Sequence, residues 1–316
     1  DVYKRQLVSS AVDGLAESFF DIASILPKDR AGEIVLAYVR MALYLKPDFP
    51  PAQLLLGEVL DSFARYADAA EVYRQVDPND AYGWAARLRL ADDLYDMGEI
   101  DEAVRILRDM SRQRAERSDA LLRLGNILRF EERYEEAVEA YDSAFERMEE
   151  GERDNWLLLY SRGIALERSG QWERAEADLL KALELEPNQP FVLNYLGYSW
   201  VEQGKNLERA RAMLENAVAQ RQEDGYIIDS MGWALYKLGE FGNAVTYLER
   251  AVALRPQDPV INDHLGDAYW RVGRTKEARI QWQRVLGLEP EEDLVESIRR
   301  KLREGLPAAN ARGSGG

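Results

Sequence analysis

The sequence contains no cysteine and only one histidine among its 316 residues. The absence of cysteine excludes disulfides, thiolate nucleophiles and cysteine-ligated zinc, but it leaves the compartment undecided because exported and cytosolic proteins can both lack this residue. Long apolar runs are also missing. The most apolar stretches, such as FFDIASIL, are far shorter than the roughly 18 residues that a membrane-spanning helix needs. We therefore expect no membrane span.

Positive charge is scarce relative to negative charge. The chain has 57 acidic and 41 basic residues, which gives a formal net charge of −16. This excess of negative charge repels a polyphosphate backbone, so the sequence predicts no nucleic-acid partner. The chain also begins with DVYKRQ, without an initiator methionine or an apolar signal segment. We interpret residues 1–15 as a truncated N-terminal segment.

The main positive feature of the sequence is an internal repeat. A small residue recurs with a period of about 34 residues, and only the interval that ends at Gly163 is several positions longer. A second small residue, alanine in seven of eight cases, follows each marker after 12 or 13 positions. Small residues at both positions let two antiparallel helices approach closely, so each interval predicts a helix pair. The eight markers are Ala23, Gly57, Ala91, Gly125, Gly163, Gly197, Gly232 and Gly266.

Glycine and proline punctuate the same period. Five glycines stand shortly after a marker, where we expect the first helix of a pair to end: Gly98, Gly170, Gly204, Gly239 and Gly273. Four prolines are expected to end second helices: Pro47, Pro187, Pro256 and Pro290.

The order of LG, Tyr or Trp, Gly, Ala, Ala and Pro at these offsets resembles the tetratricopeptide repeat. The resemblance implies an all-α fold, an α-solenoid superhelix of about eight helix-turn-helix units plus a C-terminal capping helix. The array is expected to cover residues 16–292, and the first of its repeats is degenerate. The repeat boundaries are expected at 16–49, 50–83, 84–117, 118–151, 156–189, 190–224, 225–258 and 259–292.

The segments outside the regular repeats have their own patterns. Leu294, Ile298 and Leu302 recur at every fourth position, which predicts a capping helix over residues 293–304 with one apolar face. Residues 305–316 are expected to form a disordered tail. The extra residues between the fourth and fifth repeats lie in the charged segment MEEGERDN, which we interpret as the best candidate for a flexible seam.

A narrower resemblance concerns the C-terminal half. The segments GYIIDSMGWALYKLGEFGNAVTYLERAV and DPVINDHLGDAYWRVGR resemble a group of proteobacterial tetratricopeptide proteins that often carry an export signal. This resemblance favours the periplasm over the cytoplasm.

Signals for catalysis are weak. His264 stands beside Asp263 and one repeat after Ser230, but no strained nucleophile elbow or oxyanion hole accompanies these residues. A metal site at Asp263, His264 and Asp267 is equally weak, because the two aspartates share a helix face and the histidine points about 100° away. No GxxxxGK[ST] phosphate loop occurs. We therefore expect no enzyme activity, no catalytic residue, no cofactor and no metal ion.

The residues that the repeat itself does not require indicate a binding surface. Positions three before, one after and four after each marker lie on a second face of the first helix. In tetratricopeptide arrays such positions line the concave groove, and here they are aromatic and acidic in the C-terminal half. The candidate partner-binding residues are Asn194, Tyr198, Asp229, Trp233, Tyr236, Asp263, Asp267 and Trp270.

Two functions are compatible with this pattern. In the first, the chain is a non-catalytic interaction scaffold that holds a peptide or helix of a partner protein in the groove, and the aspartates suggest a ligand with basic or amide groups. In the second, it is an architectural or assembly subunit that acts through its convex face or edges and has no groove ligand. The aromatic rings then pack only against adjacent first helices.

Overall fold

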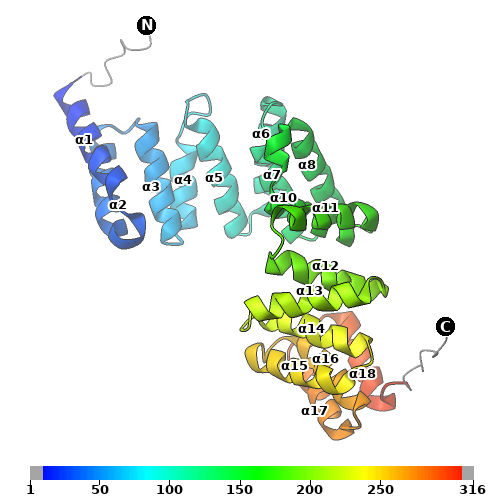
Figure 1. Cartoon of the computed structure of the whole chain (residues 1–316). Helices are drawn as coiled ribbons and strands as arrows, with labels where there is room; N and C mark the ends of the chain where they lie inside the picture. Colours follow the sequence, from blue (N-terminus) through cyan, green and yellow to red (C-terminus); the bar gives the residue numbers. More distant parts are fainter. Residues whose placement is uncertain (1–9, 308–316) are drawn as a thin grey trace. The chain divides into compact units, whose positions relative to one another are not determined.

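The computed structural model describes residues 10–307, and every regular element in this range is an α-helix, which confirms the expected all-α fold. The predicted N-terminal segment and C-terminal tail lie largely outside the described residues. The chain divides into two compact units (Figure 1). Unit 1 comprises the described part of Asp1–Arg153 together with Ile164–Gln171. Unit 2 comprises Asp154–Gly163 together with the described part of Trp172–Gly316.

Unit 1 consists of consecutive helices, each of which packs against its neighbour in the chain from α1 to α8. Pro27 precedes α2, and a non-helical residue, Ala31, kinks that helix near its start. The helices are α1 (Ala11–Ile25), α2 (Lys28–Leu45), α3 (Pro50–Ser62), α4 (Tyr66–Arg74), α5 (Gly83–Asp96), α6 (Ile100–Gln113), α7 (Asp119–Phe130), α8 (Tyr134–Arg147) and α9 (Glu150–Arg153).

The short helix α9 occupies the segment that the sequence suggested as a flexible seam. Helix α9 covers Glu150–Arg153, and residues 154 and 155, which follow it, are not helical. A flexible seam in this segment stays a prediction. The next helix, α10 (Trp156–Arg168), has its residues divided between the two units.

Unit 2 continues the pattern of helix pairs. First helices α12, α14 and α16 alternate with second helices α13, α15 and α17, and α18 packs against α17. The helices are α11 (Trp172–Leu185), α12 (Pro190–Gln203), α13 (Leu207–Gln220), α14 (Gly225–Lys237), α15 (Phe241–Leu254), α16 (Pro259–Arg271), α17 (Thr275–Leu286) and α18 (Glu292–Glu304). None of the helices between residues 10 and 307 is both long enough and apolar enough to cross a lipid bilayer.

The marker glycines are explained by a close approach between paired helices. A Cβ atom built on Gly57 would lie 2.3 Å from the ring of Tyr73, and one built on Gly266 would lie 2.5 Å from Nε1 of Trp282. Each bulky side chain comes from the second helix of the same repeat as its glycine. The first helix therefore needs a residue without a side chain at this point, because the ring crosses its backbone.

The turns inside the helix pairs share one backbone geometry. The five predicted hinge glycines adopt φ angles between 68° and 83°, in the left-handed region that favours glycine. Ala64 and Glu132 occupy the same position in the second and fourth repeats, with φ angles of 55° and 57°. In each repeat the following N–H closes the helix, as in the 2.8 Å bond from Arg133 N to Leu128 O. The turn therefore forms even where the sequence has no glycine.

Candidate functional site

The eight predicted partner-binding residues lie on three helices of unit 2 that are neighbours in space. Helix α12 packs against α14, and α14 packs against α16, so these first helices form a continuous surface that we call the first-helix face. The three aspartates are buried, and the other five side chains are half-buried. The residues are Asn194 and Tyr198 on α12, Asp229, Trp233 and Tyr236 on α14, and Asp263, Asp267 and Trp270 on α16.

Trp233 is the centre of an aromatic cluster on this face. Its ring is stacked with that of Tyr236, with centroids 4.7 Å apart and an interplanar angle of 5°, and with the imidazole of His264 at 4.0 Å and 14°. The indole Nε1 donates a 2.7 Å hydrogen bond to Glu202, whose other oxygen lies 3.2 Å from Nζ of Lys237. These contacts fix the orientation of a large amphipathic side chain that remains partly open to solvent.

His264 is paired with a carboxylate from the preceding repeat. Its Nδ1 lies 3.0 Å from both carboxylate oxygens of Asp229. Burial by itself lowers the pKa of the imidazole, but the charge and hydrogen bond of Asp229, with the nearby charges of Asp263 and Asp267, outweigh burial and raise the pKa of His264 above its ordinary value. The hydroxyl of Ser230 donates to the carbonyl of Tyr226 within α14, so it is not directed to the histidine.

Asp263 and Asp267 bind a lysine from the last helix. Nζ of Lys301 lies 2.7 Å from Oδ1 and 2.8 Å from Oδ2 of Asp263, and 2.9 Å from Oδ2 of Asp267. Trp282 donates from Nε1 to Oδ1 of Asp267 at 3.0 Å. Burial and the charge of Asp263 raise the pKa of Asp267 to about 6, against the opposing effect of Lys301. The basic group that the aspartates were expected to attract from a ligand is therefore supplied by the chain itself.

Trp270 has a structural contact that the sequence did not indicate. A Cβ atom on Gly305 would lie 2.1 Å from the Trp270 ring, so the ring packs directly on the backbone that follows α18. The ring centroid is 5.4 Å from that of Trp282, and the adjacent Arg271 donates from Nη1 to the carbonyl of Pro307 at 2.5 Å. Trp270 thus helps to hold the C-terminal helix, and only part of its ring is open to a partner.

A second acidic site lies in unit 1, and its key residue was missed by sequence reasoning. Asp93 on α5 is buried close to Asp61 on α3, whose Oδ2 accepts a 2.7 Å bond from the hydroxyl of Tyr73. One buried oxygen of each of these two carboxyl groups has no hydrogen-bond partner in the described part of the chain. Burial, and then the charge and hydrogen bond of Asp61, raise the pKa of Asp93 to about 8. Asp93 stands two positions after its marker, outside the positions that predict a groove, so the pattern gave no signal for it.

Other charged residues at the groove positions of unit 1 are paired across repeats. Glu58 lies 3.6 Å from Arg89 of the next repeat, and Asp92 forms an ion pair with Arg123. Within the described part of the chain, no group of three or more acidic or histidine side chains is placed to hold a metal ion.

Comparison with known proteins identifies the architecture. Residues 41–298 match the family model described as the Cilia and flagella-associated protein 70 C-terminal domain. A curated relative, the TPR repeat-containing protein PA4667 of Pseudomonas aeruginosa, is 28% identical over 200 residues, which are 62% of this chain and 32% of the relative.

Two solved structures share the fold. The crystal structure of the APC/C hetero-tetramer Cut9-Hcn1 has a TM-score of 0.63 and 17% identity, and the match covers 94% of this chain and 57% of that one. A tetratricopeptide repeat protein from Parabacteroides merdae has a TM-score of 0.64 and 12% identity, over 80% of this chain and 97% of that one. This chain therefore spans about a third of the curated relative and just over half of the first of these structures.

The family match extends over most of the chain and coincides with the stacked helix pairs. Proteins built from tetratricopeptide repeats generally mediate protein–protein interaction or assembly, and they are typically non-catalytic. The chain belongs to this family: it is a tetratricopeptide repeat protein that matches the C-terminal domain of cilia and flagella-associated protein 70.

Proposed function

We propose that this chain is a non-catalytic scaffold that binds a peptide or helix of a partner protein on the first-helix face of unit 2. The observation that carries the proposal is the fixed, half-buried position of Trp233, stacked with Tyr236 and His264 and hydrogen-bonded to Glu202. A large aromatic side chain that is already ordered loses little entropy on binding, and such residues dominate the energy of protein interfaces.

The pairing of the buried aspartates narrows the ligand chemistry. Asp229 is bound to His264, and Asp263 and Asp267 are bound to Lys301, so a further cation gains little from these carboxylates. We infer a ligand that places an apolar side chain against Trp233, rather than one that depends on positive charge.

The test begins with affinity capture of partners from the source cells and proceeds to calorimetry with the purified partner. Trp233→Ala should weaken binding by about 2 kcal/mol, or roughly 30-fold, as expected for a buried aromatic anchor. Tyr247→Ala is the matched control, because Tyr247 is half-buried on the second helix α15, away from this face. Unchanged affinity in Trp233→Ala, with an unchanged melting temperature, would contradict the proposal.

The alternative function, assembly through another surface, is favoured by the apolar face of the first helix pair. Tyr44 on α2 is 86% exposed and Ile25 on α1 is 80% exposed. Beside Tyr44, a hollow of about 290 Å³ is lined mainly by apolar side chains, including Phe19 and Met41. If this face mediates assembly, light scattering should show an oligomer that Tyr44→Glu dissociates. A monomer at every concentration, with Trp233-dependent partner binding, would reject this alternative.

A further inference from the structure

One edge of unit 2 carries a row of exposed apolar side chains that the repeat fold does not require. The second residue of each first helix from α10 to α16 is apolar, so the row advances by one member in every repeat. These residues are Leu157, Phe191, Tyr226 and Val260, with exposed fractions of 54%, 37%, 53% and 48%. A single exposed apolar residue is ordinary, but four at the same place in successive repeats form a pattern that the packing of the core does not require.

Two arginines cover the aromatic members of this row. The guanidinium carbon of Arg221 lies 5.0 Å from the centroid of the Phe191 ring, and that of Arg255 lies 4.9 Å from the centroid of the Tyr226 ring. Each arginine directly follows the second helix of the same repeat, and both are exposed. Neither forms an ion pair with any residue between 10 and 307. Their charges are therefore available to an external group.

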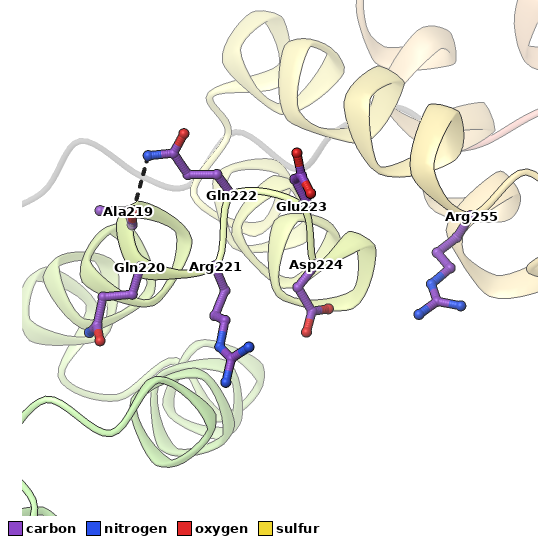
Figure 2. Close-up of a pocket in the computed structure, with 7 residues that line it drawn as sticks. All are labelled: Ala219, Gln220, Arg221, Gln222, Glu223, Asp224 and Arg255. Atoms are coloured by element: carbon purple, nitrogen blue, oxygen red, sulfur yellow. Dashed lines mark hydrogen bonds between the residues drawn. The ribbon is translucent and has the colours of Figure 1, made fainter. Parts of the chain in front are cut away.

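Two hollows adjoin these arginines. One of about 510 Å³ is lined by residues 219–224 and Arg255, and Figure 2 shows the side chains of Arg221, Asp224 and Arg255 directed to the same side of the loop. The second, of about 460 Å³, lies between Tyr226, Leu254, Arg255 and the loop that leads to α16. Arg255 lines both hollows, so they are adjacent along the edge.

The acidic side chains in the two hollows are largely used within the chain. Asp224 accepts hydrogen bonds from the N–H groups of Tyr226 and Ile227 at the start of α14, at 3.0 Å and 3.3 Å. Asp258 caps α16 in the same way, and only Glu223 is a freely exposed carboxylate in the first hollow. Arg221 and Arg255 are therefore cations that the described part of the chain leaves without an ion-pair partner, in a protein with a net charge of −16.

We propose that Phe191, Arg221, Tyr226 and Arg255, which we call the arginine–aromatic edge, form a second protein-binding surface for an acidic peptide segment with apolar side chains. Carboxylates of the peptide pair with the two guanidinium groups, which suit bidentate carboxylate recognition. Its apolar side chains lie against the two rings and in the second hollow, which Tyr226 and Leu254 line. Phe191 and Tyr226 lie about two helical turns before Tyr198 and Trp233 on the same helices, so the edge adjoins the N-terminal end of the first-helix face, and it does not depend on a ligand at Trp233. Elsewhere the acidic chain repels such a peptide, so binding is confined to this edge.

The test uses selection of displayed random dodecapeptides on the full chain, followed by fluorescence anisotropy with the synthesised peptides. Peptides that bind the edge should be rich in Asp or Glu and in large apolar residues. Arg221→Glu combined with Arg255→Glu should weaken their binding at least roughly tenfold, and added salt should weaken binding to the unmodified chain. Tyr226→Ala should also weaken it, whereas Trp233→Ala should leave it unchanged.

The matched control reverses two exposed charges on another helix, with Lys276→Glu and Arg284→Glu on α17. It changes the net charge by the same amount and should leave the affinity near that of the unmodified chain. The proposal fails if every selected peptide binds the Arg221 and Arg255 double variant as tightly as the unmodified chain. It also fails if the peptides that lose affinity for this variant are basic, or if the control variant weakens binding equally. A dependence on Trp233 instead would assign the peptides to the first-helix face.

Discussion

The buried carboxyl pair in unit 1 makes the stability of the chain depend on pH in an unusual direction. Asp93 titrates near 3.8 when unfolded but holds its proton to about pH 8 when folded, because it is buried beside Asp61. A raised carboxyl pKa stabilises the fold below pH 3.8, and this contribution is lost as the pH rises toward 8. The unfolded pKa and pH 7 differ by about three pH units, and each unit corresponds to roughly 1.4 kcal/mol. The free energy of unfolding is therefore about 4 kcal/mol lower at pH 7 than below pH 3.8 because of Asp93.

Asp93→Asn should remove this cost, because an amide keeps a hydrogen-bond donor and carries no titratable proton. The measurement is urea unfolding of both proteins from pH 5 to pH 8.5, with hydrogen exchange to show whether α3 and α5 carry the change. The variant should gain stability over the unmodified chain progressively across this range. Asp101→Asn, at an exposed position on the next helix, α6, is the control. If Asp93→Asn is less stable than the unmodified chain at pH 8, or if the stability of both proteins changes with pH in the same way, Asp93 does not hold a proton at neutral pH.

Three further predictions concern the turns and the C-terminal helix. Lys301→Met leaves Asp263 and Asp267 without their cation and should cost about 3 kcal/mol, seen as faster hydrogen exchange in α18. Glu132→Gly should raise the unfolding free energy by about 0.5 to 1 kcal/mol, because glycine relieves a left-handed backbone; a loss of stability would refute this. Trp270→Ala should lower the melting temperature more than Trp233→Ala, since Trp270 supports the segment after α18. Equal melting temperatures would contradict that assignment.

The helix pairs were predictable because each repeat meets the same steric demand. A ring or branched side chain of the second helix crosses the first at the marker, so a small residue recurs there, as at Gly125 beneath Tyr141. The hinge was predictable only in part. Ala64 and Glu132 adopt the glycine conformation because the helices on either side fix the turn, and no local residue preference reveals this.

The candidate site was less predictable than the fold, because its chemistry depends on pairs between repeats. The pattern placed Asp229 and Asp267 on the first-helix face but did not assign their partners. Lys301 stands one repeat length after Asp267, at the same position of the next helical unit, so a comparison of residues at this spacing could have predicted the ion pair. The stacking of His264 on Trp233 could not be predicted from the sequence, because it depends on side-chain rotamers.

The crossing of second-helix side chains over the marker glycines links each second helix to residues on the first helix of its repeat. The hydroxyl of Tyr141 reaches Asn126 at 2.7 Å, and Nε1 of Trp282 reaches Asp267, each beside its glycine on the first helix. A substitution of such a second-helix side chain can therefore change the hydrogen bonding of a first-helix residue that is itself unchanged. In evolution or in engineering, the polarity of the first helices can be altered through the side chain that crosses each marker glycine.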